Sequence, residues 1–411
     1  MCSISLVRLG HNVTILECSP TPLLHNQGAG IVAGGETQAF FSKHDCSKRP
    51  IGVTSRKRIY LNQRGDLIDV EDLEQRMTSW DLLYYLGRAN FDGVKSEYLP
   101  EGTPLRQHAG EGRAEYRYGC KVTDVKEVDG KLEITFENTQ YLEGQEHSQS
   151  EEERDPKSGT LQADLLIAAD GASSILRRLL IPRASNRTYA GYVAFRGTVP
   201  EASLSDAARQ ALVEKFTFFH APAVQILAYT IPGHAGALEK GKRLVNWVWY
   251  CNYDESSSEY VELMTDVGGV RHHFTLPPGG KMKPDVWERQ KERAKKTLPP
   301  QFAEVVAKTT TPFAQAITDL SPPEMGTRVG RLMNGKAILV GDALSEFRPH
   351  TAASTSQAAF HALLLEAVFE AKLTWDQYEA QVLQFAKAWF ERGVMLGTRS
   401  QFGHHPLAGN E

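Results

Sequence analysis

The sequence predicts a mixed α/β fold, α+β overall, with an open parallel sheet, a separate antiparallel sheet and helices at the C-terminal end. Two apolar runs, 163–170 and 336–342, close on an aspartate or Asp-Gly, which is typical of buried parallel strands. Residues 187–275 contain alternating or apolar segments separated by Pro and Gly, as antiparallel sheets do. Helical spacing of apolar residues then dominates the C-terminal part of the chain.

The composition excludes several classes of protein. The chain has 411 residues, enough for two or three domains, and its 46 Lys and Arg against 50 Asp and Glu give a net charge of −4. This balance argues against nucleic acid as a partner. Five cysteines without a CxxC pair predict neither a zinc site nor a disulfide framework. No apolar run reaches the ~18 residues of a membrane span and no signal peptide is recognised, so we expect a cytoplasmic protein without a membrane partner.

The N-terminal segment reads as a helix end, a glycine cap at Gly10 and a buried strand that closes on Glu17. In a dinucleotide-binding βαβ unit, such an acid follows the glycine-rich loop by ~20 residues. Only 16 residues precede Glu17, so we expect this unit to lack its phosphate loop and its first strand. The next elements expected are a helix over 36–44, a hairpin over 56–70 that turns at 64–66, and an amphipathic helix from Thr78.

The middle of the chain predicts mostly strands. A hairpin is expected around Asp129-Gly130, and the acidic segment 138–160 is expected to be a solvated loop. A helix should begin near Ser173. The antiparallel strands are expected over 192–199, 216–219, 224–231 and 244–253. Helices are expected over 284–309, with Pro299-Pro300 as a break, over 355–371 and over 375–396.

Acidic residues stand at the ends of both predicted parallel strands, as Asp170-Gly171 and Gly341-Asp342. The carboxyl edge of an open α/β sheet is where such folds bind ligands. An aspartate there can accept hydrogen bonds from ligand hydroxyls, and the N-terminus of the following helix offers free N–H groups. Each pair alone could be a simple turn, whereas the order Glu17, Asp170-Gly171, Gly341-Asp342 is far more specific.

This ordered set resembles the ribose acid, the DG motif and the GD motif of the single-component, FAD-dependent aromatic hydroxylases. Segments 191–197, 246–250, 311–317 and 348–350 are similar to the 2,6-dihydroxypyridine 3-monooxygenase branch of that family. The resemblance implies a discontinuous, Rossmann-like FAD-binding domain, N-terminally incomplete, over 1–185 and 311–373. It also implies an antiparallel-sheet substrate domain over 186–310 and a C-terminal helix and tail over 374–411.

The resemblance also implies roles for individual residues. Glu17 would hold the adenosine ribose of FAD, Asp342 the ribityl chain, and Asp170 and Gly171 the region where FAD meets the nicotinamide cofactor. Pro349 would lie beside the isoalloxazine ring, with Thr351 at the start of a helix whose dipole faces the flavin. Further cofactor contacts are assigned to Gly30, Ile31, Gly341, Ala352 and Ala353. This branch usually carries glycine at 352–354, so the alanines there are a departure.

The implied activity is hydroxylation of an electron-rich aromatic or N-heteroaromatic small molecule, with O2 as co-substrate and NADH or NADPH as electron donor. A homodimer is compatible with the resemblance. Because the phosphate loop is missing and alanines replace glycine, a second hypothesis is a flavin-free member of the scaffold that binds a small molecule or catalyses a non-redox step.

Candidate catalytic residues lie in the antiparallel region and beside Pro349. His220, Tyr229 and His350 could hydrogen-bond or deprotonate a phenol-like substrate, although His220 precedes Ala221-Pro222 and could equally be a turn residue. Strand alternation places Trp247 and Trp249 on one face and Asn246 and Tyr250 on the other, so one face should line the core or a pocket. No metal site is expected, because His272 and His273 point to opposite sides and lack a nearby carboxylate.

Overall fold

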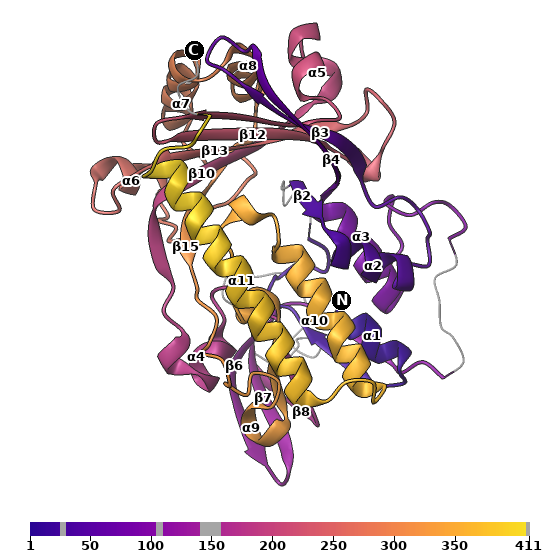
Figure 1. The fold of residues 1–411 in the computed structure, drawn as a ribbon. Coiled ribbons are helices and arrows are strands. Elements are labelled where there is room, and N and C mark those ends of the chain that lie inside the picture. The colour runs from indigo at the N-terminus through magenta and orange to yellow at the C-terminus, as the bar shows by residue number, and fades with distance from the viewer. Residues whose placement is uncertain (25–29, 104–109, 140–157, 408–411) are drawn as a thin grey trace, which may run out of the picture.

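A curled sheet of nine strands dominates one half of the molecule (Figure 1). The computed structural model describes residues 1–24, 30–103, 110–139 and 158–407. Neighbouring strands are antiparallel except β11 and β3, which are parallel. In spatial order the strands are β14 (Thr275–Leu276), β15 (Phe313–Asp319), β10 (Thr188–Pro200), β13 (Leu244–Asn252), β12 (Val224–Ile231), β11 (Phe216–Ala221), β3 (Val53–Leu61), β4 (Leu67–Ser79) and β2 (Gly30–Ala33).

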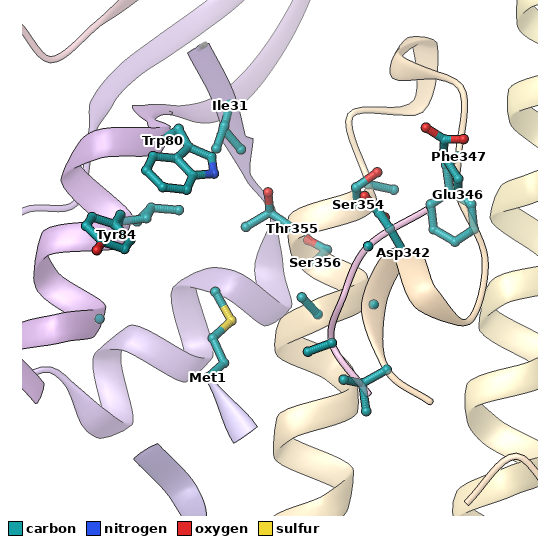
Figure 2. A pocket seen from close by; sticks show the side chains of 18 of the residues that line it. Met1, Ile31, Trp80, Tyr84, Asp342, Glu346, Phe347, Ser354, Thr355 and Ser356 are labelled. Carbon is teal, nitrogen blue, oxygen red and sulfur yellow. The ribbon is translucent and has the colours of Figure 1, made fainter. Parts of the chain in front are cut away.

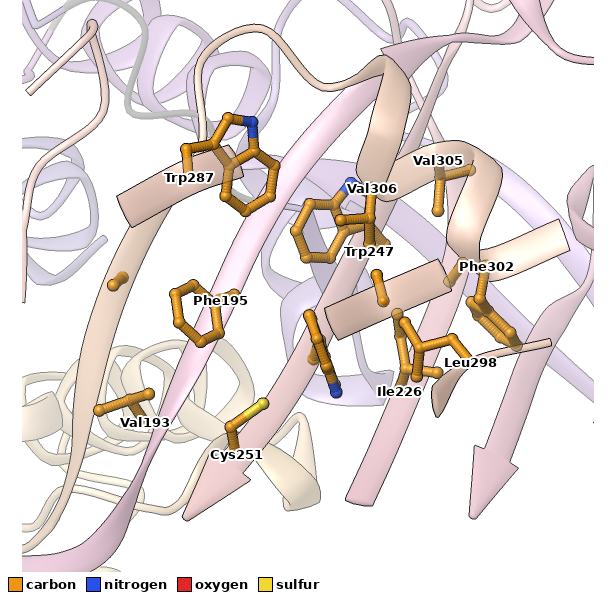
Figure 3. Packing of buried hydrophobic residues seen from close by; sticks show 14 of the residues in the cluster. Val193, Phe195, Ile226, Trp247, Cys251, Trp287, Leu298, Phe302, Val305 and Val306 are labelled. Carbon is orange, nitrogen blue, oxygen red and sulfur yellow. The ribbon is translucent and has the colours of Figure 1, made fainter. Parts of the chain in front are cut away.

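One face of this sheet is buried under three helices, α5 (Asp206–Leu212), α7 (Pro284–Thr297) and α8 (Pro300–Lys308). Figure 3 shows Trp247 and Phe195 from the sheet in one buried cluster with Trp287 of α7 and Phe302 of α8. Trp247 and Trp249 are both fully buried here, which confirms the core alternative for the tryptophan face. The opposite face carries Tyr250 and therefore faces the rest of the molecule.

Parallel strand pairs and a small antiparallel sheet form the other half. β1 (Val13–Leu16) pairs in parallel with β5 (Ala114–Arg117), and β16 (Ala337–Leu339) pairs in parallel with β9 (Leu166–Ala168). β6 (Cys120–Val128), β7 (Lys131–Asn138) and β8 (Ser158–Ala163) form an antiparallel sheet. The mixed α/β class with parallel strands, a large sheet and C-terminal helices is confirmed.

Two long helices connect the halves. α10 (Ser354–Phe369) and α11 (Trp375–Gln401) run side by side from the large sheet toward the parallel strands (Figure 1). α11 begins with a capping box between Thr374 and Gln377, which fixes its first turn. The remaining helices are α1 (Cys2–Arg8), α2 (Gly35–His44), α3 (Trp80–Asp92), α4 (Ile175–Leu180), α6 (Ser258–Leu263) and α9 (Leu332–Gly335).

Several predicted boundaries need correction. The predicted strand 163–170 is two elements, because β8 ends at Ala163 and only Leu166–Ala168 pairs with β16. Part of the predicted loop 138–160 is strand, since β8 begins at Ser158; residues 140–157 lie outside the described part of the chain. The amphipathic helix begins at Trp80 rather than Thr78, because Ser79 caps it by accepting a hydrogen bond from the Leu82 N–H. The break at Pro299-Pro300 separates α7 and α8 as predicted.

The nine-stranded sheet extends beyond the range 186–310 that was assigned to a substrate domain. β2, β3 and β4 come from residues 30–79, and β15 comes from 313–319. The division of the chain into domains therefore stays a prediction. No helix among the described residues is both long enough and apolar enough to cross a membrane.

Candidate functional site

A large cavity lies between the open face of the nine-stranded sheet, α3, the N-terminus of α10 and the ends of the parallel strands. Figure 2 shows Ile31, Trp80 and Tyr84 on one side of it. Ser354, Asp342 and Glu346 lie on the other side (Figure 2). Its volume is about 2360 Å³, more than twice that of an ordinary ligand pocket of about 1,000 Å³. All fourteen residues predicted for the site line this cavity: Glu17, Gly30, Ile31, Asp170, Gly171, His220, Tyr229, Gly341, Asp342, Pro349, His350, Thr351, Ala352 and Ala353.

Asp342 follows β16 and lines the cavity beside α10. Its Oδ1 is buried and has no hydrogen-bond partner among the described residues. Burial raises the pKa of Asp342 to about 7, and the negative charge of Glu346 adds to the rise. The preceding Gly341 has φ +58° and donates its N–H to Nδ1 of His361 at 2.9 Å, which fixes the turn. This carboxyl is therefore positioned to accept hydrogen bonds from a ligand.

Glu17 lies at the end of β1 and also lines the cavity. Its Oε1 accepts a hydrogen bond from the Ser19 N–H at 2.8 Å. This local contact orients the carboxylate at the end of the strand, where the resemblance expects a ribose acid.

Asp170 has a structural task in addition to any contact with a ligand. Its Oδ2 accepts hydrogen bonds from the N–H groups of Ile175 at 2.9 Å and Leu176 at 3.2 Å, and its Oδ1 accepts one from the Ser174 hydroxyl at 2.5 Å. Asp170 therefore holds the first turn of α4. The next residue, Gly171, has φ +74°, a conformation that favours glycine at this position.

The segment Pro349–Thr351 forms a 3-10 turn that leads into α10. Ala352 has φ +54°, a left-handed conformation that costs a residue with a Cβ about 1–2 kcal/mol. Ala353 is the N-cap of α10 and supplies no side-chain hydrogen bond to it. The first N–H groups of this 16-residue helix therefore keep their positive partial charge at the cavity.

The sheet wall is built from alternate residues of β10, β12 and β13. Tyr229 is 5% exposed and stands opposite Asn246, whose Oδ1 accepts the Gly30 N–H at 2.9 Å. A Cβ on Gly30 would lie 2.6 Å from Asn246 and 2.7 Å from Tyr229, so this glycine is required by packing. Burial raises the pKa of Tyr229 to about 12, so its hydroxyl stays protonated at neutral pH.

Both candidate histidines are held in contacts with other rings. His350 Nε2 lies 3.0 Å from the Tyr192 hydroxyl, and its ring stacks on Tyr250 at 4.1 Å. Burial, followed by the charges of Arg348 and Arg196, lowers the pKa of His350 to about 3. Burial also lowers the pKa of His220 well below its usual value, and the His405 ring lies on it at 3.6 Å. Such low pKa values are poorly matched to proton transfer at neutral pH. A role of either histidine as a general base stays a prediction.

Several residues that line the cavity carried no role assigned from the sequence, and Arg196 and His405 are two of them. Arg196 stands inside the 191–197 motif and lines the cavity from β10, yet it carried no assigned role. His405 follows α11 and reaches the cavity only because that helix ends beside β12. The 191–197 motif could have pointed to Arg196, whereas His405 has no local sequence signal because its place depends on which elements the fold brings together.

Known proteins are similar to this chain over most of its length. A family model described as FAD binding domain-like matches residues 189–319. Over 98% of its length the chain is 26% identical to the 2,6-dihydroxypyridine 3-monooxygenase of Paenarthrobacter nicotinovorans, of which it covers 88%. The chain is a relative of the FAD-dependent aromatic hydroxylases. The family resemblance expected from the sequence is thereby confirmed.

Solved structures of this group share the fold. The 2,6-dihydroxypyridine-3-hydroxylase of Arthrobacter nicotinovorans matches all of this chain and 92% of its own, with a TM-score of 0.78 and 23% identity. The HpxO protein of Klebsiella pneumoniae, solved with FAD and uric acid, matches 99% of this chain and 87% of its own with a TM-score of 0.68 and 16% identity. A salicylate hydroxylase substrate complex matches all of this chain and 88% of its own with a TM-score of 0.63 and 15% identity.

The residues of the cavity fit FAD where its hydroxyl groups and its ring would lie. Asp342 has a buried oxygen without a partner, Glu17 presents a carboxylate, and the N-terminus of α10 has free N–H groups. These are the acceptors and the positive dipole end that ribityl hydroxyls, ribose hydroxyls and an electron-rich ring edge require.

Proposed function

We propose that this protein is an FAD-dependent monooxygenase that uses NADH or NADPH and O2 to hydroxylate an electron-rich aromatic or N-heteroaromatic small molecule. The observation that carries the proposal is the large cavity, which joins two hydroxyl-accepting carboxylates to an aromatic sheet wall. The similarity to a 2,6-dihydroxypyridine 3-monooxygenase along 98% of the chain supports the same activity.

Bound FAD would supply the redox chemistry, taking electrons from the nicotinamide and passing one oxygen atom of O2 to the ring. The chain would bind and orient the reactants. Asp342 would accept hydrogen bonds from the ribityl hydroxyls, and Glu17 would accept them from the adenosine ribose. The dipole of α10 would favour negative charge beside Pro349 and Thr351. Gly30, Ile31, Asp170, Gly171, Gly341, Ala352 and Ala353 would line the cofactor.

The sheet wall would hold the substrate ring. Tyr229 keeps its proton and can donate a hydrogen bond to a ring oxygen, whereas the uncharged imidazoles of His220 and His350 can accept one. The surrounding aromatic side chains would limit the access of water to the ring.

The test is an absorption spectrum of the protein followed by an activity assay. Protein incubated with excess FAD and freed of unbound cofactor should show flavin absorbance. NADH or NADPH oxidation and O2 uptake should then rise when a hydroxylated ring is added, with a product one oxygen atom heavier by mass spectrometry. A protein that remains colourless would instead favour the flavin-free hypothesis, and oxidation without a heavier product would exclude ring hydroxylation.

We also propose a cytoplasmic location and a homodimeric assembly. The absence of disulfides among the five cysteines, all of which lie in the described residues, supports a reducing compartment. Cell fractionation and light scattering of the purified protein test the two proposals separately.

A further inference from the structure

The sheet wall of the cavity carries positive but no negative side chains. Among the described residues of the nine-stranded sheet that line the cavity, none is Asp or Glu, and two are arginines, Arg58 and Arg196. The carboxylates that line the cavity belong to other elements. An anion on this wall would therefore meet no repulsion from neighbouring carboxylates on the sheet.

The two arginines differ in their partners. Arg58 donates through Nε to Gln75 at 2.9 Å and pairs with Glu71 at 3.7 Å. Arg196 has no hydrogen bond or ion pair to any residue in the described ranges, and its Nε is buried. A partly buried guanidinium without an acceptor is costly. Its planar fork of N–H donors matches a carboxylate or a ring oxygen that carries negative charge.

Arg196 lies next to the candidate catalytic residues. It stands opposite Val248 in the β10–β13 register, two pairs away from Tyr250 and therefore on the same face of the sheet. Its charge opposes the rise that burial causes in the pKa of Tyr229 and Tyr250, and it adds to the lowering of the pKa of His350. All three neighbours are uncharged at neutral pH, so the charge of Arg196 is not compensated on this part of the wall.

We infer that Arg196 binds the negatively charged oxygen of an aromatic substrate, so that the cavity selects rings bound as anions. The inference rests on the proposed function and assigns its substrate class. For a ring hydroxyl, the O–H bond breaks, the electron pair stays on the ring oxygen beside Arg196, and the proton passes to solvent. The cation lowers the cost of that ionisation, and no strong base is needed.

The experiment compares anions with neutral analogues of similar shape by isothermal titration calorimetry on the FAD-incubated protein. Salicylate and salicylamide test a carboxylate, and 2,6-dihydroxypyridine and 2,6-dimethoxypyridine test a ring oxygen. Wild-type protein should bind at least one anion more tightly than its neutral analogue. Arg196→Gln should weaken that anion roughly 10- to 100-fold, the size of a charged hydrogen bond, and change the neutral analogue less than about threefold.

Two further variants separate charge from folding. Arg196→Lys keeps the charge but loses the fork, so the preference for the anion should survive in weaker form. Arg392→Gln removes an exposed arginine that lines the same cavity from α11, and it should leave the preference unchanged. Should Arg196→Gln not fold, the wild-type preference and its retention in Arg196→Lys decide the question.

Equal weakening of anion and neutral analogue in Arg196→Gln would overturn the inference, as would wild-type protein that binds neither anion preferentially. Failure of the inference and failure of the proposed function give different results. Ring hydroxylation without charge selectivity would leave the monooxygenase proposal intact and remove the role of Arg196. Selective anion binding without hydroxylation would support the role of Arg196 and contradict the monooxygenase proposal.

Discussion

At the scale of single residues, Ala352 has a strained backbone conformation just before the N-terminus of α10. Its φ of +54° is left-handed, and glycine adopts this conformation without the Cβ penalty. We expect Ala352→Gly to raise the free energy of unfolding by about 0.5–1 kcal/mol, because relief of strain exceeds the added entropy of the unfolded chain. Urea unfolding monitored by circular dichroism measures the change.

The neighbouring Ala353 provides the control. Its φ of −105° is unstrained and its side chain is 4% exposed, so Ala353→Gly removes a buried methyl group and relieves nothing. We expect it to lower the free energy of unfolding by about 1 kcal/mol. Similar effects of the two substitutions would contradict the assignment of strain to Ala352.

Asp342 makes stability depend on pH at one residue. Its folded pKa of about 7 lies above the unfolded value near 4, so the folded protein retains a proton that the unfolded chain has released. The stabilising contribution of the protonated Asp342 carboxyl is therefore fully present below pH 4 and is lost as the pH rises from 4 through 7. Relative to wild-type protein, Asp342→Asn should be more stable at pH 8 than at pH 5, as measured by urea unfolding at both values.

An exposed carboxylate gives the matched comparison for Asp342. Asp164 is 87% exposed and pairs only loosely with Lys131 at 3.4 Å. The difference between Asp164→Asn and wild-type protein should be nearly constant from pH 5 to 8. A constant difference for Asp342→Asn as well would show that its carboxyl ionises normally.

At the scale of elements, two glycines let α11 approach the turn that carries His350. A Cβ on Gly397 would lie 2.3 Å from the Tyr192 hydroxyl, the group that contacts His350. A Cβ on Gly393 would lie 3.2 Å from Thr351 Cγ2. We expect Gly397→Ala to lower the free energy of unfolding by about 1–3 kcal/mol, because the helix must move away from Tyr192. Thermal unfolding measures this loss.

A glycine in an open helix position separates packing from helix propensity. Gly87 lies inside α3, and a Cβ there would meet no atom within 4 Å. Gly87→Ala should stabilise the protein by about 0.5–1 kcal/mol. If Gly397→Ala were equally stabilising, α11 would not be in close contact with Tyr192.

Elements with strong local signals could be predicted from the sequence, and elements defined by distant partners could not. The hairpin of β3 and β4, the proline break before α8 and both long C-terminal helices follow from turn chemistry and periodicity. β8 lacks a continuous apolar run because it is a half-exposed strand with alternating burial, so its first residues were assigned to a loop. β5 was not predicted, since its four partly buried residues give no period.

At the scale of the whole molecule, the motifs of the candidate site could be predicted from the sequence, but the set of residues that lines the cavity from the sheet could not. Glu17, Asp170 and Asp342 stand at strand ends, where sequence order and fold rules already bring them to one edge. Arg196 and His405 join them only through the curl of the sheet and the end of α11. A charge without a partner is visible only once its three-dimensional neighbours are known.

Buried histidines should make the whole molecule sensitive to acid. Burial lowers the pKa of His44, His220, His350, His361 and His405 below the usual 6.5. Each stays neutral in the folded protein while the unfolded chain takes up a proton, so the contribution of each histidine to stability is present above pH 6.5 and is lost as the pH falls. For His361, fully buried with a pKa of about 3, the loss at pH 5 is about 2 kcal/mol.

Asp342 acts in the opposite direction, because its proton uptake below pH 7 favours the folded state. One carboxyl cannot balance five histidines, so we expect the free energy of unfolding to fall between pH 7 and pH 5. Asp342→Asn removes the opposing contribution and should make this fall steeper. Urea unfolding of both proteins across this range tests the prediction. A free energy that stays level or rises toward pH 5 would mean that the histidines are protonated in the folded protein.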